Sequence, residues 1–164
     1  MKQLSILFTM FCLFSSCSYA VKDKDWQQTS KVVYRHSTPT ITPEYYRSYS
    51  VTFTEVETVV EIRDYSKVLL TKRYPSTATQ FKALVNNLQA MGVKKKKEVV
   101  SGAAGCESES LSLFKGESEY FSAYEACGDG NLEVKKGDLN VLVKELVPDL
   151  DKLINQTLNN VNEE

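Results

Sequence analysis

The stretch Ser48-Tyr-Ser-Val-Thr-Phe-Thr-Glu-Val-Glu-Thr-Val-Val-Glu-Ile-Arg63 decides the fold. Its first half places Tyr49, Val51 and Phe53 at alternate positions with hydroxyl residues between them, and its second half repeats the alternation as far as Ile62. Successive side chains of a strand point to opposite faces, so a period of two indicates a strand with one buried face. We therefore predict two neighbouring strands that share one polar face.

Strand signals continue on both sides of this stretch. Asp64-Tyr-Ser66 is a turn sequence, and Val68 to Tyr74 predicts a third strand. Towards the N-terminus, Lys31 to Arg35 predicts a short strand, which a proline-containing connection over residues 36–43 separates from the next strand. Together these segments predict an antiparallel meander.

A helix should follow the meander. Thr77 and Gln80 are spaced as a capping box, and Gly92 has the residue type expected just after a helix C-terminus. Apolar residues between them recur at helical spacing, at Phe81, Leu84, Val85, Leu88 and Met91. The sequence therefore predicts a helix from Ala78 to Met91.

The C-terminal part predicts a short strand at Asn131 to Val134 and two further helical segments. These are Leu139 to Leu146, with Asp138 as its N-cap, and Pro148 to Leu158. A strands-then-helix pattern thus occurs twice, although no internal repeat is convincing. We predict an α+β fold, with an antiparallel sheet (meander plus hairpin) packed by about two helices, in a single domain over residues 31–164.

A second hairpin carries two cysteines. Leu111 to Phe114 and Tyr120 to Glu125 are strand-like runs, and a four-residue loop between them would pair Phe114 with Glu119. The same register places Cys106 opposite Cys127, so we predict a disulfide between them. A two-residue loop would misalign this pair. A redox pair is disfavoured because the chain has no Cys-x-x-Cys motif.

The N-terminus has the features of an export signal. Lys2 supplies a positive charge, and Leu4 to Phe14 is an apolar run that is too short to cross a bilayer as a helix. We therefore predict a signal peptide over residues 1–16 and exclude it from the fold. The mostly polar residues that follow, as far as Ser30, predict a tether over residues 17–30.

Two cleavage sites compete at the end of this signal. Leu13-Phe-Ser-Ser-Cys17 resembles the lipobox of bacterial lipoproteins, in which the cysteine is lipidated and becomes the new N-terminus, although Phe14 departs from the usual leucine. The resemblance implies a membrane anchor at Cys17, and Ser18 in place of an aspartate favours the outer membrane. Alternatively, small residues in Ser18-Tyr-Ala20 would allow ordinary cleavage and release a soluble periplasmic or secreted protein that starts at Val21.

The remaining sequence resembles small lipoproteins of Bacteroidota-like bacteria. The resemblance rests on Cys106, on the strand Leu111-Ser-Leu-Phe114, on the Tyr-x-x-x-Tyr-x-x-Cys segment that ends at Cys127 and on the turn Leu146-Val-Pro-Asp-Leu150. It implies no particular activity.

Composition and motifs exclude several function classes. The 20 Lys and Arg residues nearly balance 21 Asp and Glu, so a generic nucleic-acid binder is excluded. The chain has no Gly-x-Ser-x-Gly elbow and no glycine-rich nucleotide loop, and its single histidine, His36, is expected at the surface or at a sheet edge. Glu107 and Glu109 are expected in water. We predict no metal, no cofactor and no enzymatic activity.

Tyrosine is the most informative surplus in the sequence. Tyr45, Tyr46, Tyr120 and Tyr124 could form an exposed patch that contacts a protein or a glycan of the envelope, or could simply belong to a sheet packed under helices. We predict an exported, lipid-anchored envelope protein that acts by binding. The alternative is a secreted inhibitor or immunity-like protein that blocks an exported enzyme.

Overall fold

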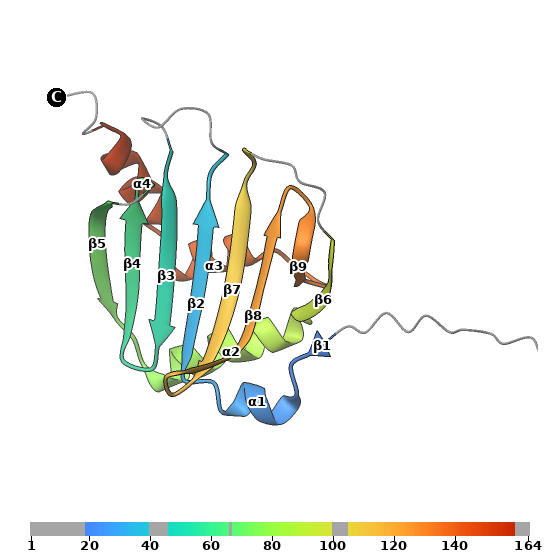
Figure 1. Cartoon of the computed structure of the whole chain (residues 1–164). Coiled ribbons are helices and arrows are strands. Elements are labelled where there is room, and N and C mark those ends of the chain that lie inside the picture. Colours follow the sequence, from blue (N-terminus) through green and yellow to red (C-terminus); the bar gives the residue numbers. More distant parts are fainter. Residues whose placement is uncertain (1–18, 40–45, 66, 100–104, 160–164) are drawn as a thin grey trace, which may run out of the picture.

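Nine antiparallel strands form one sheet in the order β1-β6-β9-β8-β7-β2-β3-β4-β5 (Figure 1). The computed structural model describes residues 19–39, 46–65, 67–99 and 105–159. The strands are β1 (Tyr19–Ala20), β2 (Lys31–Ser37), β3 (Ser48–Thr54), β4 (Glu57–Arg63), β5 (Val68–Pro75), β6 (Lys94–Val99), β7 (Ser108–Lys115), β8 (Ser118–Ala126) and β9 (Asp129–Glu133). The helices are α1 (Asp23–Gln27), α2 (Ala78–Ala90), α3 (Leu139–Leu146) and α4 (Leu150–Asn159).

Strand β2 lies at the centre of the sheet, where the two halves of the chain meet. Tyr34 of β2 is opposite Val51 of β3 on one side and Leu111 of β7 on the other. Strands β3 to β5 extend the sheet in one direction, and β8, β9 and β6 extend it in the other. The pairing of β2 with β7 is therefore the contact that joins the predicted meander to the predicted hairpin.

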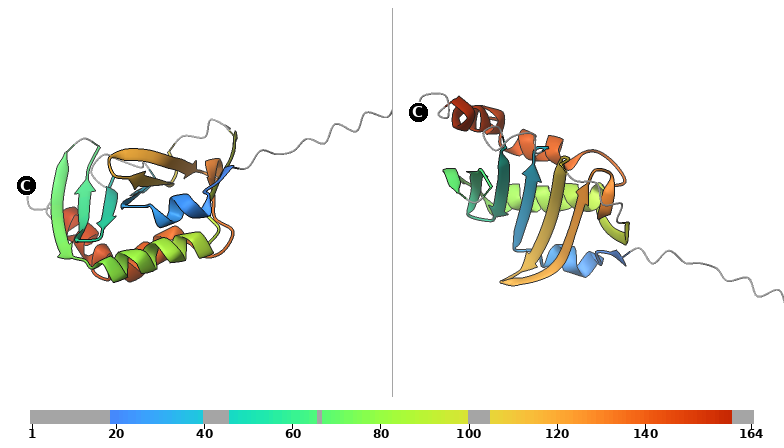
Figure 2. Two further views of the ribbon diagram at one scale, coloured as in Figure 1. Left: turned by 90° about the horizontal axis from the view of Figure 1, so that it is seen from below. Right: turned by 45° about the horizontal axis from the view of Figure 1, so that its top comes forward.

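Helices α2, α3 and α4 cover one face of this sheet, and the other face is open along its central strands (Figure 2). The alternation seen in the sequence decides which side chains are covered. From the sheet, the core takes alternate apolar residues such as Val32, Tyr34, Val51, Val60, Ile62, Leu111 and Leu113. From the helices, it takes Phe81, Leu84, Val85, Leu88, Leu139, Val143, Leu150 and Leu153. The structure confirms a single α+β domain with an antiparallel sheet.

Both predicted N-caps form. The hydroxyl of Thr77 accepts a hydrogen bond from the backbone N–H of Gln80 at 3.3 Å, and the carboxylate of Asp138 accepts one from Val141 at 3.0 Å. Each bond satisfies an amide that the first helical turn leaves without a partner. Gly92 has a φ of 68° just after α2, in the left-handed region that glycine adopts without strain.

The predicted disulfide between Cys106 and Cys127 is confirmed, with 5.6 Å between the two Cα atoms. Phe114 pairs with Glu119 as expected, but Lys115 also pairs with Ser118, so the loop has only two residues. A register shift beside Leu113 offsets the shorter loop. Cys127 and Gly128 then form the next turn, with φ values of 58° and 81°, as a two-residue hairpin turn with two positive φ angles requires.

Residues 19–30 differ from the tether predicted for residues 17–30. Tyr19–Ala20 pairs with β6 as β1, and Asp23–Gln27 forms α1. Trp26 of α1 is buried in the core, since a large indole gains more from leaving water than a polar segment loses by becoming ordered. The hydroxyls of Thr29 and Tyr120 lie 2.6 Å apart and fix the end of this segment to β8. Cys17 lies outside the described residues.

Candidate functional site

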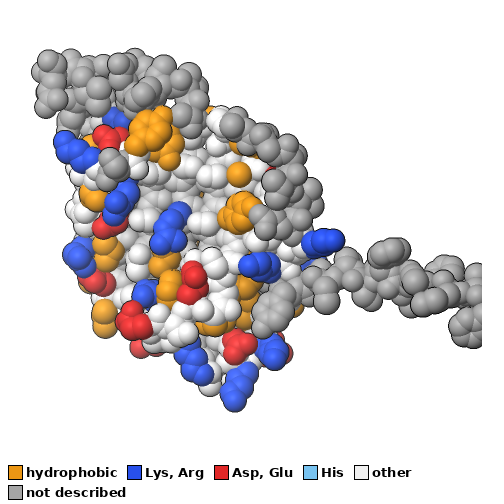
Figure 3. Space-filling view, viewed as in Figure 1, with side chains coloured by type: hydrophobic (Ala, Val, Ile, Leu, Met, Phe, Trp, Pro, Cys, Tyr) orange, Lys and Arg blue, Asp and Glu red, His pale blue; other side chains and the backbone are white. Residues whose placement is uncertain are grey.

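The open face of the sheet carries a hydroxyl-rich surface, which we call the serine face. It is built from the polar positions of β2, β3, β7 and β8, which alternate with the core positions of the same strands. Its hydroxyl residues are Ser37, Ser48, Ser50, Thr52, Ser108, Ser110, Ser112 and Ser122. Figure 3 looks onto this face, and its middle is mostly white, the colour of the backbone and of side chains that are neither charged nor hydrophobic.

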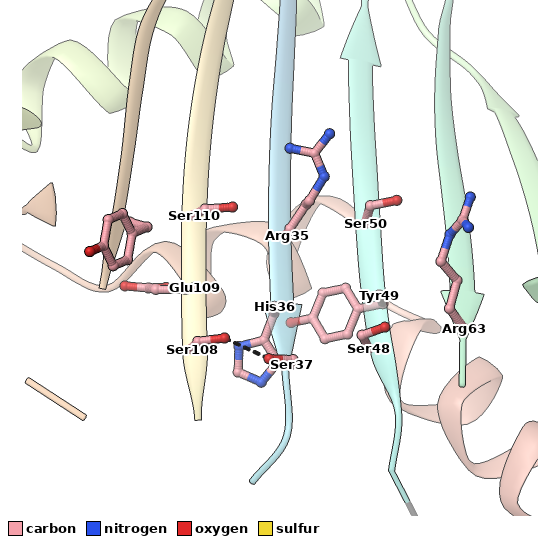
Figure 4. Close-up of a pocket in the computed structure, with 11 residues that line it drawn as sticks. Arg35, His36, Ser37, Ser48, Tyr49, Ser50, Arg63, Ser108, Glu109 and Ser110 are labelled. Carbon is pink, nitrogen blue, oxygen red and sulfur yellow. Dashed lines mark hydrogen bonds between the residues drawn. The ribbon is translucent and has the colours of Figure 1, made fainter. Parts of the chain in front are cut away.

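Two hollows lie end to end on the serine face. The first has a volume of about 360 Å³ and lies at the sheet edge where β2 ends and β3 and β7 begin (Figure 4). Ser37, Ser48, Ser108 and Ser110 line it from the serine face, and His36, Tyr49 and Glu109 line it from the covered face. The second lies further along the same strands and shares Arg35, Ser50 and Arg63 with the first. A ligand longer than one hollow could therefore extend along the strands.

Hydroxyl pairs link the strands across this face. The Oγ atoms of Ser37 and Ser108 lie 2.6 Å apart, and those of Ser112 and Ser122 lie 3.3 Å apart. Each hydroxyl has one hydrogen to donate and two lone pairs that accept. Ser37, Ser108 and Ser122 therefore keep hydrogen-bonding capacity for a ligand after the cross-strand bond has formed, whereas Ser112 is only 2% exposed.

Two arginines supply positive charge on the serine face, and Figure 4 shows them on β2 and β4. A guanidinium nitrogen of Arg63 lies 2.8 Å from the carboxylate of Glu61 on its own strand. Arg35 is exposed and forms no ion pair with any residue that the structure describes. Since a guanidinium binds carboxylate and sulfate groups through paired N–H donors, Arg35 offers this face an anion-binding group.

The four tyrosines predicted as a binding patch are distributed over the molecule. Tyr124 is 40% exposed and lines the first hollow of the serine face. Tyr46 stacks on Tyr65, with 4.3 Å between the ring centroids. Tyr120 is half-buried, and its hydroxyl contacts Thr29. Tyr45 lies outside the described residues, so Tyr124 is the member of this set that the structure brings to the serine face.

Sequence reasoning missed Arg35, Arg63 and the serines of β7. Each arginine lies at a polar position of an ordinary alternating strand. The sequence of either strand therefore does not indicate that the two arginines share one surface. The pairing of β2 with β3 and β7, together with that of β3 with β4, brings these residues to one surface. The repeated Ser-x-Ser spacing at residues 48–50 and 108–112 was the signal that could have found the face.

His36 is buried, which corrects the expectation of a surface or edge residue. It has the same parity as Val32 and Tyr34 and therefore points to the helix-covered side, where its side chain is only 8% exposed. Its ring stacks on that of Tyr49 with 5.0 Å between centroids. Glu109, expected in water, is likewise half-buried and accepts a hydrogen bond from Tyr34 at 2.9 Å.

Compared with known proteins, the chain matches no family model, no curated protein and no solved structure. Within the described ranges, no helix combines the length and the apolar character that a membrane span needs. Nor does this part of the chain bring together three or more His, Cys, Asp or Glu side chains in a way that could hold a metal ion.

Proposed function

We propose that this chain is an exported, lipid-anchored envelope protein that acts by binding rather than by catalysis. The support for export is the apolar run that ends at Cys17 in a lipobox-like sequence. Several acyl chains on one cysteine anchor a protein stably, whereas one chain gives only marginal binding. The disulfide between Cys106 and Cys127 agrees with an oxidising compartment outside the cytoplasm.

The binding surface in this proposal is the serine face, and its ligand is an envelope glycan that carries carboxylate groups. The observation behind it is a sheet face that no described helix covers and that presents hydroxyls beside Arg35 and Arg63. Sugar hydroxyls are both donors and acceptors, as serine hydroxyls are. Tyr124 adds an aromatic ring against which a sugar could pack.

Charge favours an acidic glycan over a neutral one. The carboxylate of Glu61 is held by Arg63, and that of Glu57 by Arg73 at 2.8 Å, whereas Arg35 has no such counter-charge in the described residues. The carboxylate of a uronic acid bound at Arg35 would supply the missing negative charge. A neutral sugar would leave the guanidinium bound to water only.

Mass spectrometry of the mature protein tests the anchor. The proposal expects an N-terminal Cys17 carrying acyl chains. A mature protein that starts at Val21 with a free amine would contradict the lipid anchor, and it would leave the serine face to be tested separately.

Calorimetric titration with oligogalacturonate tests the ligand. The wild-type protein should bind this uronic-acid oligomer and should not bind neutral dextran of the same length. Arg35→Ala should weaken binding about tenfold, because a hydrogen bond to a charged group contributes about 1.5 kcal/mol or more. Lys152→Ala removes an equally exposed cation from α4, behind the sheet, and should leave the affinity unchanged. Equal losses in both variants would contradict the proposal.

A further inference from the structure

A further cavity adjoins the first hollow of the serine face at the end of the same strands and shares His36, Ser108 and Glu109 with it; we call it the acidic cavity. It has a volume of about 310 Å³ and lies between the ends of β7 and β8 and the start of α3. Three glutamates of the β7–β8 hairpin line it, namely Glu107, Glu109 and Glu125, together with Asp138 from the N-terminus of α3. None of its lining residues in the described part of the chain is a lysine or an arginine.

His36 lines this cavity, and one buried nitrogen of its ring has no hydrogen-bond partner among the described residues. Nδ1 of His36 is fully buried and makes no hydrogen bond to any described residue. Nε2 lies 3.3 Å from a carboxylate oxygen of Glu107. In Figure 4 the ring lies beside β7, and the nitrogen next to its point of attachment is directed towards that strand.

The tautomer of His36 follows from this geometry. Burial lowers the pKa of His36, while the charge of Glu107 opposes that shift only in part, so the ring is neutral near pH 7. A neutral imidazole has one donor nitrogen and one acceptor nitrogen. Nε2 faces a carboxylate and therefore carries the hydrogen, which leaves Nδ1 as a buried acceptor that lacks a donor.

The charged groups that line the cavity are all acceptors, whereas Ser108 and the side-chain amide of Asn140 also carry donors. The carboxylate of Glu109 accepts from Tyr34, and the side-chain oxygen of Asn140 accepts from Tyr49 at 3.0 Å. Burial raises the pKa of Glu109, and the nearby charges of Asp138, Glu125 and Glu107 raise it further although the bond from Tyr34 lowers it. The cavity thus combines mutually repelling carboxylates with an acceptor that needs a donor.

We propose that the acidic cavity binds a primary alkylammonium group, which occupies the space between Glu107, Glu109 and Nδ1 of His36. An ammonium has three N–H donors and no acceptor, so it complements the carboxylates of the cavity and the acceptor nitrogen of His36. Its positive charge offsets the repulsion among the carboxylates. The same chemistry occurs in a free diamine and in the side chain of a lysine in a peptide.

Calorimetric titration of the full exported protein with 1,5-diaminopentane tests the charge requirement. We expect one binding site for the diamine and no binding of 1,5-pentanediol, which has the same length but no charge. An N-acetylated Gly-Lys-Gly peptide, whose one ammonium is that of the lysine side chain, forms the second arm, and whichever of the two amines binds more tightly identifies the source. Failure of both amines, or equal binding of the pentanediol, would overturn the proposal.

Matched variants on one hairpin locate the site. Glu107→Gln should weaken diamine binding at least fivefold, and because the Glu107 side chain is 63% exposed the variant should fold normally. Glu117→Gln is the same substitution at the other end of the hairpin, where the side chain is 98% exposed, and it should change nothing. Equal effects of both variants would show diffuse electrostatic attraction and would overturn the proposal.

The ring of His36 gives a readout that a purely electrostatic effect would not move. When the diamine binds, the ¹⁵N resonance of Nδ1 should shift, because its lone pair gains a hydrogen bond, while Nε2 should change less. An unchanged Nδ1 resonance at saturating diamine would contradict binding in the acidic cavity. These experiments use no glycan, so their failure would leave the proposed function of the serine face intact.

Discussion

Neighbouring residues of strand β2 point to opposite faces of the sheet, one covered by helices and the other open. Tyr34 and His36 point to the helices and are buried, whereas Arg35 between them is exposed on the serine face. On the covered face the hydroxyl of Tyr34 donates a hydrogen bond to the carboxylate of Glu109. On the open face Ser37 and Ser108 pair with each other and remain accessible. Polar groups on the two faces should therefore differ in what their removal costs.

Truncating a buried side chain of β7 should give the largest difference between the faces. Leu111→Ala leaves a cavity in the core and should lower the free energy of unfolding by about 2–5 kcal/mol. Ser110→Ala on the opposite face of the same strand should change it by less than about 0.5 kcal/mol. Urea denaturation of both variants measures the contrast, and equal losses would show that the serine face is not solvated.

Removing the disulfide should destabilise the end of the hairpin where the acidic cavity and the first hollow of the serine face lie. Cys106→Ser combined with Cys127→Ser opens a link across 21 residues of sequence separation and should cost roughly 3 kcal/mol. Because Cys106 and Cys127 line the acidic cavity and not the serine face, diamine binding should weaken more than glycan binding. Denaturation and both titrations of the double variant test this order.

Removing one hydroxyl from each face compares the stability cost of the same chemical change on the covered face and on the open face. Tyr34→Phe deletes the donor to the half-buried carboxylate of Glu109 and should cost about 1–3 kcal/mol. Ser37→Ala deletes one half of the pair with Ser108 on the open face, where water can replace it, and should cost under about 0.5 kcal/mol. Thermal unfolding at neutral pH should give a lower midpoint for Tyr34→Phe than for Ser37→Ala, and similar midpoints would contradict the predicted difference between the faces.

Lowering the pH should reduce the stability of the protein through protonation of His36 on the covered face. Because burial lowers its pKa in the folded state, the unfolded state binds the proton first as the pH falls below 6.5. The contribution of His36 to stability is therefore present above pH 6.5 and is lost below it. Glu107, Asp138 and Lys144 are the charged groups that act on the ring.

A variant without an ionisable group at position 36 isolates the contribution of His36 to the pH dependence of stability. In His36→Gln, the fall in the free energy of unfolding below pH 6.5 should be smaller than in the wild type. Glu109 acts in the opposite direction, since its raised folded-state pKa adds stability as the pH falls through that value. The same pair of measurements in a Glu109→Gln background removes this opposing contribution. Parallel pH profiles with and without His36 would contradict the prediction.

Local patterns predicted the elements of the fold well because their causes lie within a few residues. The alternation from Tyr49 to Ile62 predicted two neighbouring strands of a meander, and these strands pair antiparallel in the structure. The caps at Thr77 and Asp138 gave helix starts that the structure confirms. The disulfide partners were predicted correctly although the loop at Gly116 has two residues and not four, because the register shift beside Leu113 offsets the difference.

The candidate site could not be assembled from the sequence, because its residues come from strands joined by non-local pairing. Arg35 and Ser110 are opposite each other only because β2 pairs with β7. Burial of His36 was within reach, since the spacing Val32, Tyr34, His36 continues one buried parity. The expected tether failed at Trp26, whose large side chain is buried in the core.

The smallest predicted effect concerns the arginines of the serine face. Arg63→Ala breaks a surface ion pair with Glu61 and should lower the free energy of unfolding by about 0.2–1 kcal/mol. Arg35→Ala breaks no ion pair in the described structure and should leave it unchanged within about 0.5 kcal/mol. High salt should reduce the Arg63 effect, because ions screen exposed charges. If Arg35→Ala destabilised the protein more than Arg63→Ala, Arg35 would be a structural residue, and its place in the binding surface would need a different explanation.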